Sequence, residues 1–454
     1  MAPRALLLCY HFHPSSEVGA KRTNALTEYL IAGGAPPVLV SAFSEADAEQ
    51  LETQTGRRFP GCTLVPIPES GRTLLDLMIM AKASLARWRG RRTKLSSALT
   101  VAADQSTSEV PCASRLKDAF FAALYAVDDK KRWSLRASRK AASAAKTHRA
   151  EIIFASGPPM SPLGAAILAG RRAGVPVVID FRDPCFYPLS GGGHSWVTRF
   201  SNSIRRRFEA WVVRRADAIV CTAPSLGELL RQRYPDAADR VHFIPNGFDG
   251  TPAPPAPTHG LLHIVFAGEL YLNRNPLGFL EAVSALLVEE GIDRSRVRVT
   301  FVGKCDTYRG QELRTWLAGK PAGHVTQILP KVGQEALQDI YANATALLNL
   351  AQGQPMQIPA KTFEQLAIGK ELLLVCETDS DTARLVQGVP GVHQVTGDDP
   401  TGLLDVLRGL YDRHVRQSRT DAPTKDQIAA FSRAEQNQKL AGLFDRCIKN
   451  YGKR

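Results

Sequence analysis

The sequence predicts an α/β protein of two doubly wound domains, and three observations lead to this prediction. The chain has 454 residues, which exceeds the size at which a single hydrophobic core keeps growing. Short apolar runs alternate with longer segments of helical periodicity in both halves. A proline-rich segment, 251–257, separates the halves and cannot continue a helix. Because strands that alternate with helices form parallel sheets covered on both faces, each half should fold as one such domain.

The first half opens with an apolar run at 5–10, a segment of helical period at 20–31 and a second apolar run at 37–41. This order is that of a β-α-β unit. The same alternation returns at four later apolar runs, 152–155, 176–180, 218–221 and 241–244. We therefore predict an N-terminal domain at 1–250 and a semi-rigid linker at 251–260.

The alternation restarts after the linker. Apolar runs occur at 264–267, 299–302, 346–350 and 372–375, with helical segments between them. This pattern predicts a second doubly wound domain at 261–422. The tail, 423–454, is helical in pattern and carries aromatic and aliphatic residues that need a surface to pack on. We expect this tail to cross back to the first domain.

Residues 70–114 interrupt the rhythm and are predicted to form an insertion on the first domain. An apolar run at 74–80 leads into six cations between Lys82 and Lys94. One interpretation is a helix that docks on anionic lipid, since apolar burial and charge attraction add together. The other is a surface helix on its own domain followed by a solvated charge run, and the small number of apolar residues favours it.

The charge balance favours an anionic partner. The formal net charge is +13 and the pI is about 9.5, which suits nucleic acid, anionic lipid or phosphorylated metabolites. The basic residues are spread through both halves without interleaved aromatic residues or a recognised module, so no nucleic acid is expected.

Three further patterns bear on the compartment and on metals. No run of about eighteen apolar residues occurs, and no cleavage-like site follows the first apolar run. A cytoplasmic protein is therefore expected, and attachment to the inner face of the cytoplasmic membrane stays open. The eight cysteines show no paired spacing, which favours a reducing compartment. The histidines show no metal spacing, so neither a metal nor another cofactor is expected.

The most informative segment is 358–370, which runs directly into the apolar strand 371–375. It places Lys361 and Glu364 three residues apart on what should be the first turn of a helix. A helix start with a cation and an acid suits a ligand that is both polyanionic and polyhydroxylated. A nucleotide sugar is such a ligand.

Four motifs stand out along the chain: 12–14 with Gly19, 153–159, 178–184 and 244–249. Together they resemble motifs of glycosyltransferase family 4, whose members have the GT-B fold of two Rossmann-like domains and a returning C-terminal helix. The second and third are similar to the bacterial cell-surface-polysaccharide branch of the family. The resemblance implies an acceptor-side first domain, a nucleotide-sugar-binding second domain and a site at the cleft between them, as expected for ligands beyond the carboxyl ends of parallel strands.

The resemblance also implies roles for residues of the second domain. Glu364 matches the second acid of the family's paired-glutamate motif, and its carboxylate should accept hydrogen bonds from the ribose hydroxyls. Met356 stands where the first acid would fall, so Gln354 or Gln357 would serve in its place.

The family presents two cations to the diphosphate from the strand and loop that resemble 266–274 here. Gly268 lies in this strand, and Glu269 replaces one of the cations, so only Arg274 survives. Lys361 would supply the second charge from the neighbouring helix start.

Two groups in the first half are further candidates. Arg182 and Asp183 follow a buried strand, where many members carry a histidine that contacts the sugar; a structural ion-pair loop around Asp180 is an equal alternative. Gly19 and Lys21 are better placed to face the donor phosphate or the acceptor, since a glycine there lets the backbone approach a ligand.

These inferences predict a glycosyltransferase of the hexosyltransferase type. It would move a sugar from a nucleoside-diphosphate-sugar to a glycan or polyprenyl-linked acceptor in cell-surface polysaccharide biosynthesis, with retention of configuration. Two alternatives are a nucleotide-sugar epimerase of the same fold and a non-catalytic, membrane-peripheral binding subunit. Met356 and Glu269 keep the second alternative open.

Overall fold

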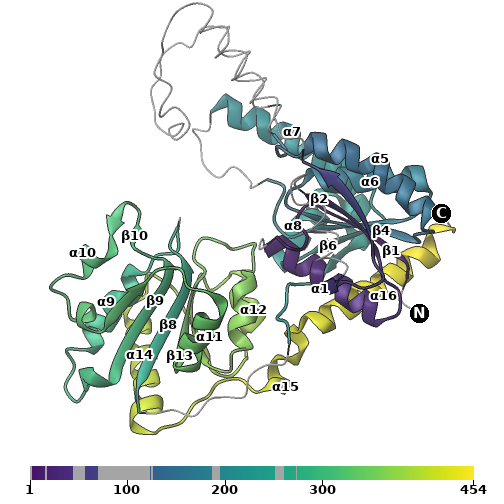
Figure 1. Ribbon diagram of the computed structural model, residues 1–454. Helices are drawn as coiled ribbons and strands as arrows, with labels where there is room; N and C mark the ends of the chain where they lie inside the picture. Colours follow the sequence, from purple (N-terminus) through teal and green to yellow (C-terminus); the bar gives the residue numbers. More distant parts are fainter. Residues whose placement is uncertain are drawn as a thin grey trace, which may run out of the picture. The chain divides into compact units, whose positions relative to one another are not determined.

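The computed structural model describes residues 3–15, 18–43, 57–69, 123, 126–186, 195–250, 260–271 and 273–453 (Figure 1). The chain divides into two compact units, Met1–Ile219 with Phe444–Arg454, and Val220–Leu443. The predicted insertion at 70–114 and nearly all of the predicted linker lie outside the described residues. The domain bounds inferred from the sequence stay predictions.

The first sheet has seven strands in the order β3-β2-β1-β4-β5-β6-β7. Their bounds are β1 Ala5–Cys9, β2 Val38–Phe43, β3 Thr63–Pro68, β4 Ile152–Gly157, β5 Val177–Phe181, β6 Ala218–Cys221 and β7 Val241–Phe243. The pairings of β1 with β2 and β4, of β2 with β3, and of β4 with β5 are parallel. The strand order reverses direction between β1 and β4, which makes their carboxyl ends a topological switch point.

Helices cover this sheet because its central strands are buried along their whole length. The helices are α1 Val18–Ala32, α5 Lys131–Thr147, α6 Ser161–Ala173, α7 Trp196–Val213, α8 Pro224–Arg233 and the 3₁₀ helix η2 Pro235–Arg240. Gly174 ends α6 in the left-handed conformation, at φ 75°.

The second sheet has six strands in the order β12-β9-β8-β13-β14-β15, and all of its pairings are parallel (Figure 1). Their bounds are β8 Leu262–Glu269, β9 Val297–Lys304, β12 Thr326–Leu329, β13 Ala346–Leu350, β14 Glu371–Val375 and β15 Val392–Val395. A short antiparallel pair, β10 Thr307–Tyr308 and β11 Gln311–Glu312, follows β9. The order of the six strands reverses between β8 and β13, which gives a second switch point.

The helices of this half are short. They are α9 Leu277–Leu286, η3 Arg294–Arg296, α10 Leu313–Leu317, η4 Pro321–His324, α11 Gln334–Ala342, α12 Ala360–Leu366, α13 Asp381–Val386, α14 Pro400–Tyr411, the π-helical turn η5 Asp412–Arg416, α15 Lys425–Ile428 and η6 Ala429–Phe431. Phe266, Phe279 and Phe301 are nearly or fully buried in the core between the sheet and its helices.

The last helix, α16 Arg433–Tyr451, ends the chain. Its final part clusters with the first unit, and Phe444 packs there against Phe154 of β4 with ring centroids 5.7 Å apart. The predicted fold, two doubly wound parallel sheets with a C-terminal helix that returns to the first domain, is confirmed. Among the described helices, none is long and apolar enough to cross a membrane.

A buried ion-pair network ties together the end of the second sheet opposite its switch point. Glu371, the first residue of β14, is fully buried, and its carboxylate accepts two hydrogen bonds at 2.7 and 3.1 Å from the Arg413 guanidinium. His393 Nε2 lies 2.7 Å and His414 Nε2 3.1 Å from the same carboxylate, and the Asp421 backbone N–H also donates to it. These partners outweigh the cost of burial and hold the pKa of Glu371 far below its ordinary value.

We expect Glu371→Gln to lower the free energy of unfolding by about 3 kcal/mol at neutral pH, because it removes the buried carboxylate that pairs with Arg413 and leaves this half-buried cation only the longer contact to Asp421, 3.6 Å. The folded pKa of Glu371 lies below its unfolded value, so the stabilisation is present above about pH 5 and shrinks as the pH falls. Urea denaturation as a function of pH measures both effects. Glu435→Gln, on an exposed pair with Lys439, is the control and should change stability by about 0.5 kcal/mol or less. Equal losses in the two variants would contradict the assignment.

Candidate functional site

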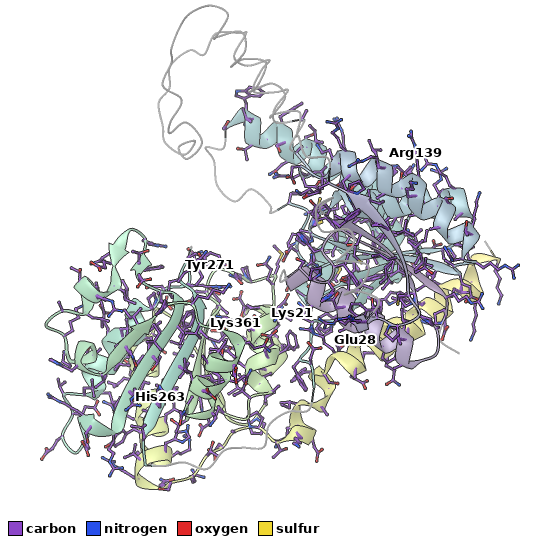
Figure 2. The ribbon with its side chains drawn as sticks, in the orientation of Figure 1. Lys21, Glu28, Arg139, His263, Tyr271 and Lys361 are labelled. Carbon is purple, nitrogen blue, oxygen red and sulfur yellow. The ribbon has the colours of Figure 1, made fainter. Side chains whose placement is uncertain are left out.

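The candidate site lies at the carboxyl ends of β8 and β13, where the order of the second sheet reverses. Ligands of doubly wound sheets bind at such a switch point, beyond the carboxyl ends of the strands. Arg274 lies in the connection after β8, and Lys361 is the second residue of α12, which follows β13. The structure therefore brings both predicted diphosphate-binding cations to one switch point. Figure 2 shows Lys361 and Tyr271 at this end of the sheet and His263 near the other.

Arg274 is held by its own loop. Its backbone N–H donates to the Tyr271 carbonyl at 3.1 Å, and its guanidinium stacks over the Tyr271 ring at 4.3 Å. Nη1 donates a long hydrogen bond, 3.5 Å, to the Glu269 carbonyl. Nε is buried without a hydrogen-bond partner in the part of the chain that the structure describes. Burial lowers the pKa of Arg274 from its usual value, although an arginine stays charged at any pH of interest.

Lys361 is the most unusual side chain of the site. Its Nζ is buried 4.7 Å from the centroid of the Phe266 ring, and no described residue accepts a hydrogen bond from it. Burial, and then the nearby Arg274 cation, lower the pKa of Lys361 to about 7. Cys305 lies close by, but burial raises the pKa of its thiol to about 12, so it offers no counter-ion. The ammonium is thus prepared for an anion that the protein does not itself supply.

Helix α12 is fixed on the sheet by polar bonds to β13. Asn349, fully buried within β13, donates from Nδ2 to the Thr362 hydroxyl at 2.9 Å, and the Gln365 amide donates to the Leu348 carbonyl at 3.2 Å. Phe363 fills the core beneath the helix. These anchors were not predicted from the sequence. An asparagine inside an otherwise apolar strand was the available signal, since a buried amide needs partners.

The strands beside the site approach closely at two glycines. Gly268 of β8 pairs with Gly303 of β9, and both have positive φ, 152° and 118°. A side chain at Gly303 would place Cβ 2.2 Å from the Gly268 carbonyl oxygen. This contact accounts for Gly303, and the positive φ accounts for Gly268. Ligand binding by Gly268 stays a prediction.

The sequence predicted that Glu364 lies on the first turn of its helix, but the structure places it beyond that turn. It is the fifth residue of α12, because the helix begins only at Ala360, after the Pro359 cap. Its carboxylate is 40 % exposed, lies 3.9 Å from the Arg433 guanidinium, and adds to the burial that raises the pKa of Tyr341 to about 12. The helix dipole therefore contributes little to this carboxylate, and recognition of ribose by Glu364 stays a prediction.

The two glutamines predicted to replace the missing first acid, Gln354 and Gln357, lie in the connection after β13, and Gln354 is half-buried. Gln357 is half-buried, and its backbone carbonyl accepts from the Thr382 hydroxyl at 3.1 Å. Met356, also half-buried, stands where the paired-glutamate motif would have its first acid. The Glu269 carboxylate forms an ion pair with Lys304 Nζ at 3.4 Å.

A cavity of 620 Å³ lies beside the Arg274 loop and was not anticipated from the sequence. Two side chains that line it, Gln352 and Glu377, each carry a buried oxygen that lacks a hydrogen-bond partner among the described residues. The other oxygen of Glu377 accepts from the Gly353 backbone N–H at 2.7 Å. Carboxylate and amide oxygens that need donors are suited to a ligand with hydroxyl groups.

The first switch point contains the remaining candidates. Asp180 is fully buried and accepts two hydrogen bonds from Arg22 of α1, at 3.0 and 3.1 Å, and one from the Ser156 hydroxyl at 2.7 Å. The structure therefore contains a buried ion pair at this loop, and its cation comes from α1.

Arg182 lies against Gly19, with its guanidinium 2.6 to 2.8 Å from where a Cβ at that glycine would be. It also donates to the Pro158 carbonyl, and burial lowers its pKa. Gly19 and Arg182 are thus brought together, whereas Lys21 is exposed and Asp183 is half-buried. Roles of these four residues toward a ligand stay predictions.

Within the described residues, no group of three or more His, Cys, Asp or Glu side chains is arranged to hold a metal ion. Independence from metals and other cofactors stays a prediction for the chain.

Comparison with known proteins bears on this site. Residues 99–251 match the family model described as Glycosyltransferase Family 4. A comparison with the curated proteins found no significant match.

Three solved structures are similar over almost the whole chain. The first is the N-terminal domain of trehalose-6-phosphate phosphatase from Candida albicans, with 11% identity, a TM-score of 0.62, and 98% of this chain and 97% of that chain covered. The second is HepE of Anabaena in complex with UDP-glucose, with 13% identity, a TM-score of 0.54, and 98% of this chain and 99% of that chain covered. The third is the lipopolysaccharide outer core galactosyltransferase WaaB, with 10% identity, a TM-score of 0.55, and 97% of this chain and 99% of that chain covered.

At these identities the likeness to solved structures shows the fold alone, which is the GT-B fold. The family match adds sequence evidence over about a third of the chain. The predicted resemblance to GT-B glycosyltransferases of family 4 is confirmed, and the two findings together support a glycosyltransferase as the class of protein.

Lys361→Met should stabilise the protein, because methionine replaces a buried ammonium that lacks a hydrogen-bond partner. The folded pKa of about 7 lies below the unfolded value of 10.5. Wild-type Lys361 therefore costs stability most fully below pH 7, on the order of 4 kcal/mol, and the cost disappears as the pH rises towards 10. Denaturant unfolding of both proteins from pH 6 to pH 10 measures this difference. A variant less stable than wild type at pH 6 would contradict the burial argument.

Proposed function

We propose that this protein transfers a hexose from a nucleoside-diphosphate-sugar to a glycan or polyprenyl-linked acceptor in cell-surface polysaccharide biosynthesis, with retention of configuration. The observation that carries the proposal is the buried Lys361 ammonium beside Arg274 at the second switch point. Two neighbouring cations at one switch point match the charge of a diphosphate. The family match supports this choice, as does the similarity to HepE, which was solved with UDP-glucose.

The two cations would act mainly in the transition state. The bond between the anomeric carbon and the diphosphate oxygen breaks, and negative charge collects on the leaving diphosphate. Cations already placed at that position stabilise the charge without reorganisation. Lys361 becomes fully protonated when the diphosphate arrives, since the anion supplies the counter-charge that the apo site lacks.

Attack by the acceptor hydroxyl on the same face as the leaving group needs no strong protein nucleophile. Its proton passes to the departing phosphate oxygen, so charge and atoms balance. No carboxylate near Arg274 is required as a nucleophile, which is compatible with Met356 at the first motif position.

The remaining predicted residues would bind the rest of the substrates. Glu364 would accept from the ribose hydroxyls, because its carboxylate is partly exposed on α12, the helix that carries Lys361. Gln357 with Gln354, and the backbone at Gly268, would contact the donor sugar. Arg182, Asp183, Gly19 and Lys21 would contact the acceptor or the donor phosphate.

We expect one nucleoside diphosphate among UDP, GDP, ADP and dTDP to raise the melting temperature, since a ligand that binds only the folded state stabilises it. Lys361→Met and Arg274→Ala should each weaken its binding by roughly ten- to a hundredfold, the value of a hydrogen bond to a charged group. Glu364→Ala should weaken binding of the nucleoside diphosphate but not of inorganic pyrophosphate. Thermal-shift and calorimetric titrations measure these effects.

Lys370→Met is the matched control for this experiment. Lys370 is also a buried lysine with a lowered pKa, but its Nζ donates to the Ala342 carbonyl at the other end of the sheet. Its replacement should leave nucleotide affinity unchanged. If no nucleotide binds the wild type, the non-catalytic alternative is favoured; turnover of a nucleotide sugar without any acceptor would favour the epimerase.

Donor affinity should depend on pH through Lys361. Binding favours the charged amine, so it raises the pKa of Lys361 above the apo value of about 7. Affinity for the nucleoside-diphosphate-sugar should be constant below pH 7 and fall up to tenfold per unit above it, with proton uptake on binding. Calorimetry in buffers of different ionisation enthalpy measures this uptake. In Lys361→Met the dependence above pH 7 should vanish, and its persistence there would assign it to another group.

A further inference from the structure

The charged side chains on the outer face of helix α5, in the first unit, are all cationic. Its sequence contains no acid, and its exposed cations are Arg132, Arg136, Arg139, Lys140 and Lys146. Figure 2 shows Arg139 projecting from α5 away from the body of the unit. Leu135, on the same exposed side, is 61% exposed. The opposite side of the helix is made of alanines and Trp133, which are buried.

Helix α7 continues beyond the body that it packs on. Near its carboxyl end, Phe208 and Trp211 pack against α6, where only a glycine, Gly164, leaves them room. Near its amino end, the aromatic side chains Trp196 and Phe200 are 38% and 39% exposed. Within the part of the chain that the structure describes, the aromatic side chains of the helix are thus covered in its carboxyl half and partly exposed in its amino half.

Cations border the open half of α7. Arg199 is exposed in that half, and Arg206 and Arg207 are exposed just beyond the middle of the helix. The helix has a single acid, Glu209, and it is buried. Spacings of three, four and seven residues place Trp196, Arg199, Phe200 and Ser203 along one side, so aromatic and cationic groups alternate on one surface.

The two helices belong to one layer, because α6 packs against both α5 and α7. Figure 1 shows the three helices together on the first unit. The cationic face of α5 and the open half of α7 therefore border the same layer of this unit.

We propose that the outer face of α5 and the amino-terminal half of α7 dock on an anionic phospholipid bilayer. Burial of Trp196, Phe200 and Leu135 at the interface and attraction of the arginines and lysines to anionic headgroups add together. Tryptophan and arginine are suited to the boundary between headgroups and acyl chains, since each has an apolar body and a polar end. The surface differs from the segment 70–114 for which the sequence suggested this role.

A nucleic acid would match the cations but leaves the apolar groups unexplained. Phosphate contacts need only charge, whereas Leu135 has no partner on a phosphate backbone. The absence of acid from the exposed sides of both described helices favours a uniformly anionic plane over a protein partner of mixed charge.

The test is co-sedimentation of the full-length protein with vesicles of phosphatidylcholine alone or mixed with phosphatidylglycerol. Wild type should bind only the mixed vesicles and be released by high salt, because salt screens exposed charges. Arg132→Glu/Arg139→Glu/Lys140→Glu should weaken binding at least a hundredfold, given roughly a fivefold contribution per cation. Trp196→Ser/Phe200→Ser should weaken it by at least about tenfold.

Arg298→Glu/Lys331→Glu/Lys425→Glu is the matched control, with the same charge change at exposed positions of the second unit, and should bind like wild type. Circular dichroism and nucleotide-induced thermal shifts establish that each variant is folded. An equal loss in the control, equal binding to neutral vesicles, or unchanged binding by the α5 variant would overturn the proposal. The proposal would also be overturned if duplex DNA displaced the protein from the mixed vesicles and the Trp196→Ser/Phe200→Ser variant still bound these vesicles like wild type. The assay needs no turnover, so its outcome is separate from that of the proposed function.

Discussion

The proposed function of the second unit depends on one unfavourable arrangement, the convergence of Arg274 and Lys361 at the switch point of a parallel sheet. Lys361 is buried over Phe266 without a hydrogen-bond partner among the described residues, and Arg274 raises the cost of its charge. A site of this kind persists only when the surrounding fold holds it in place. The bonds from Asn349 and Gln365 that fix α12 to β13 provide that restraint.

The first switch point differs from the second because its buried cation has a counter-ion within the protein. There the buried cation, Arg22, is matched by Asp180, which also accepts from Ser156. Glu371 and Arg413 form a second compensated pair at the far end of the second sheet. A buried charge is thus normally paired in this protein. Among the described residues, Lys361 departs from this pattern because its Nζ has neither a counter-ion nor a hydrogen-bond acceptor, and this marks the position at which an anion from outside is expected.

The proposed reaction needs a fold that holds the site in place and cations in that site that the protein does not neutralise. A diphosphate that leaves with its charge concentrated on oxygen needs fixed cations, and cations that already have protein partners offer less to it. The cavity beside the Arg274 loop, with its unpaired oxygens on Gln352 and Glu377, extends the same argument to hydroxyl groups. Membrane docking through α5 and α7 would bring a lipid-linked acceptor to the enzyme without involving these residues.

The sequence by itself determined the two doubly wound sheets, because the alternation of apolar runs and helical segments is a local property that repeats along the chain. It also placed Lys361 after β13 and Arg274 after β8, since both follow strands that were visible as apolar runs. Which charges are paired was decided only by the tertiary structure. Arg22 meets Asp180, Gly19 makes room for Arg182, and Lys361 meets Arg274 rather than a carboxylate, all through contacts between segments far apart in the chain. The energy of a charge depends on burial and on such neighbours, and neither is encoded by the spacing of residues within one segment.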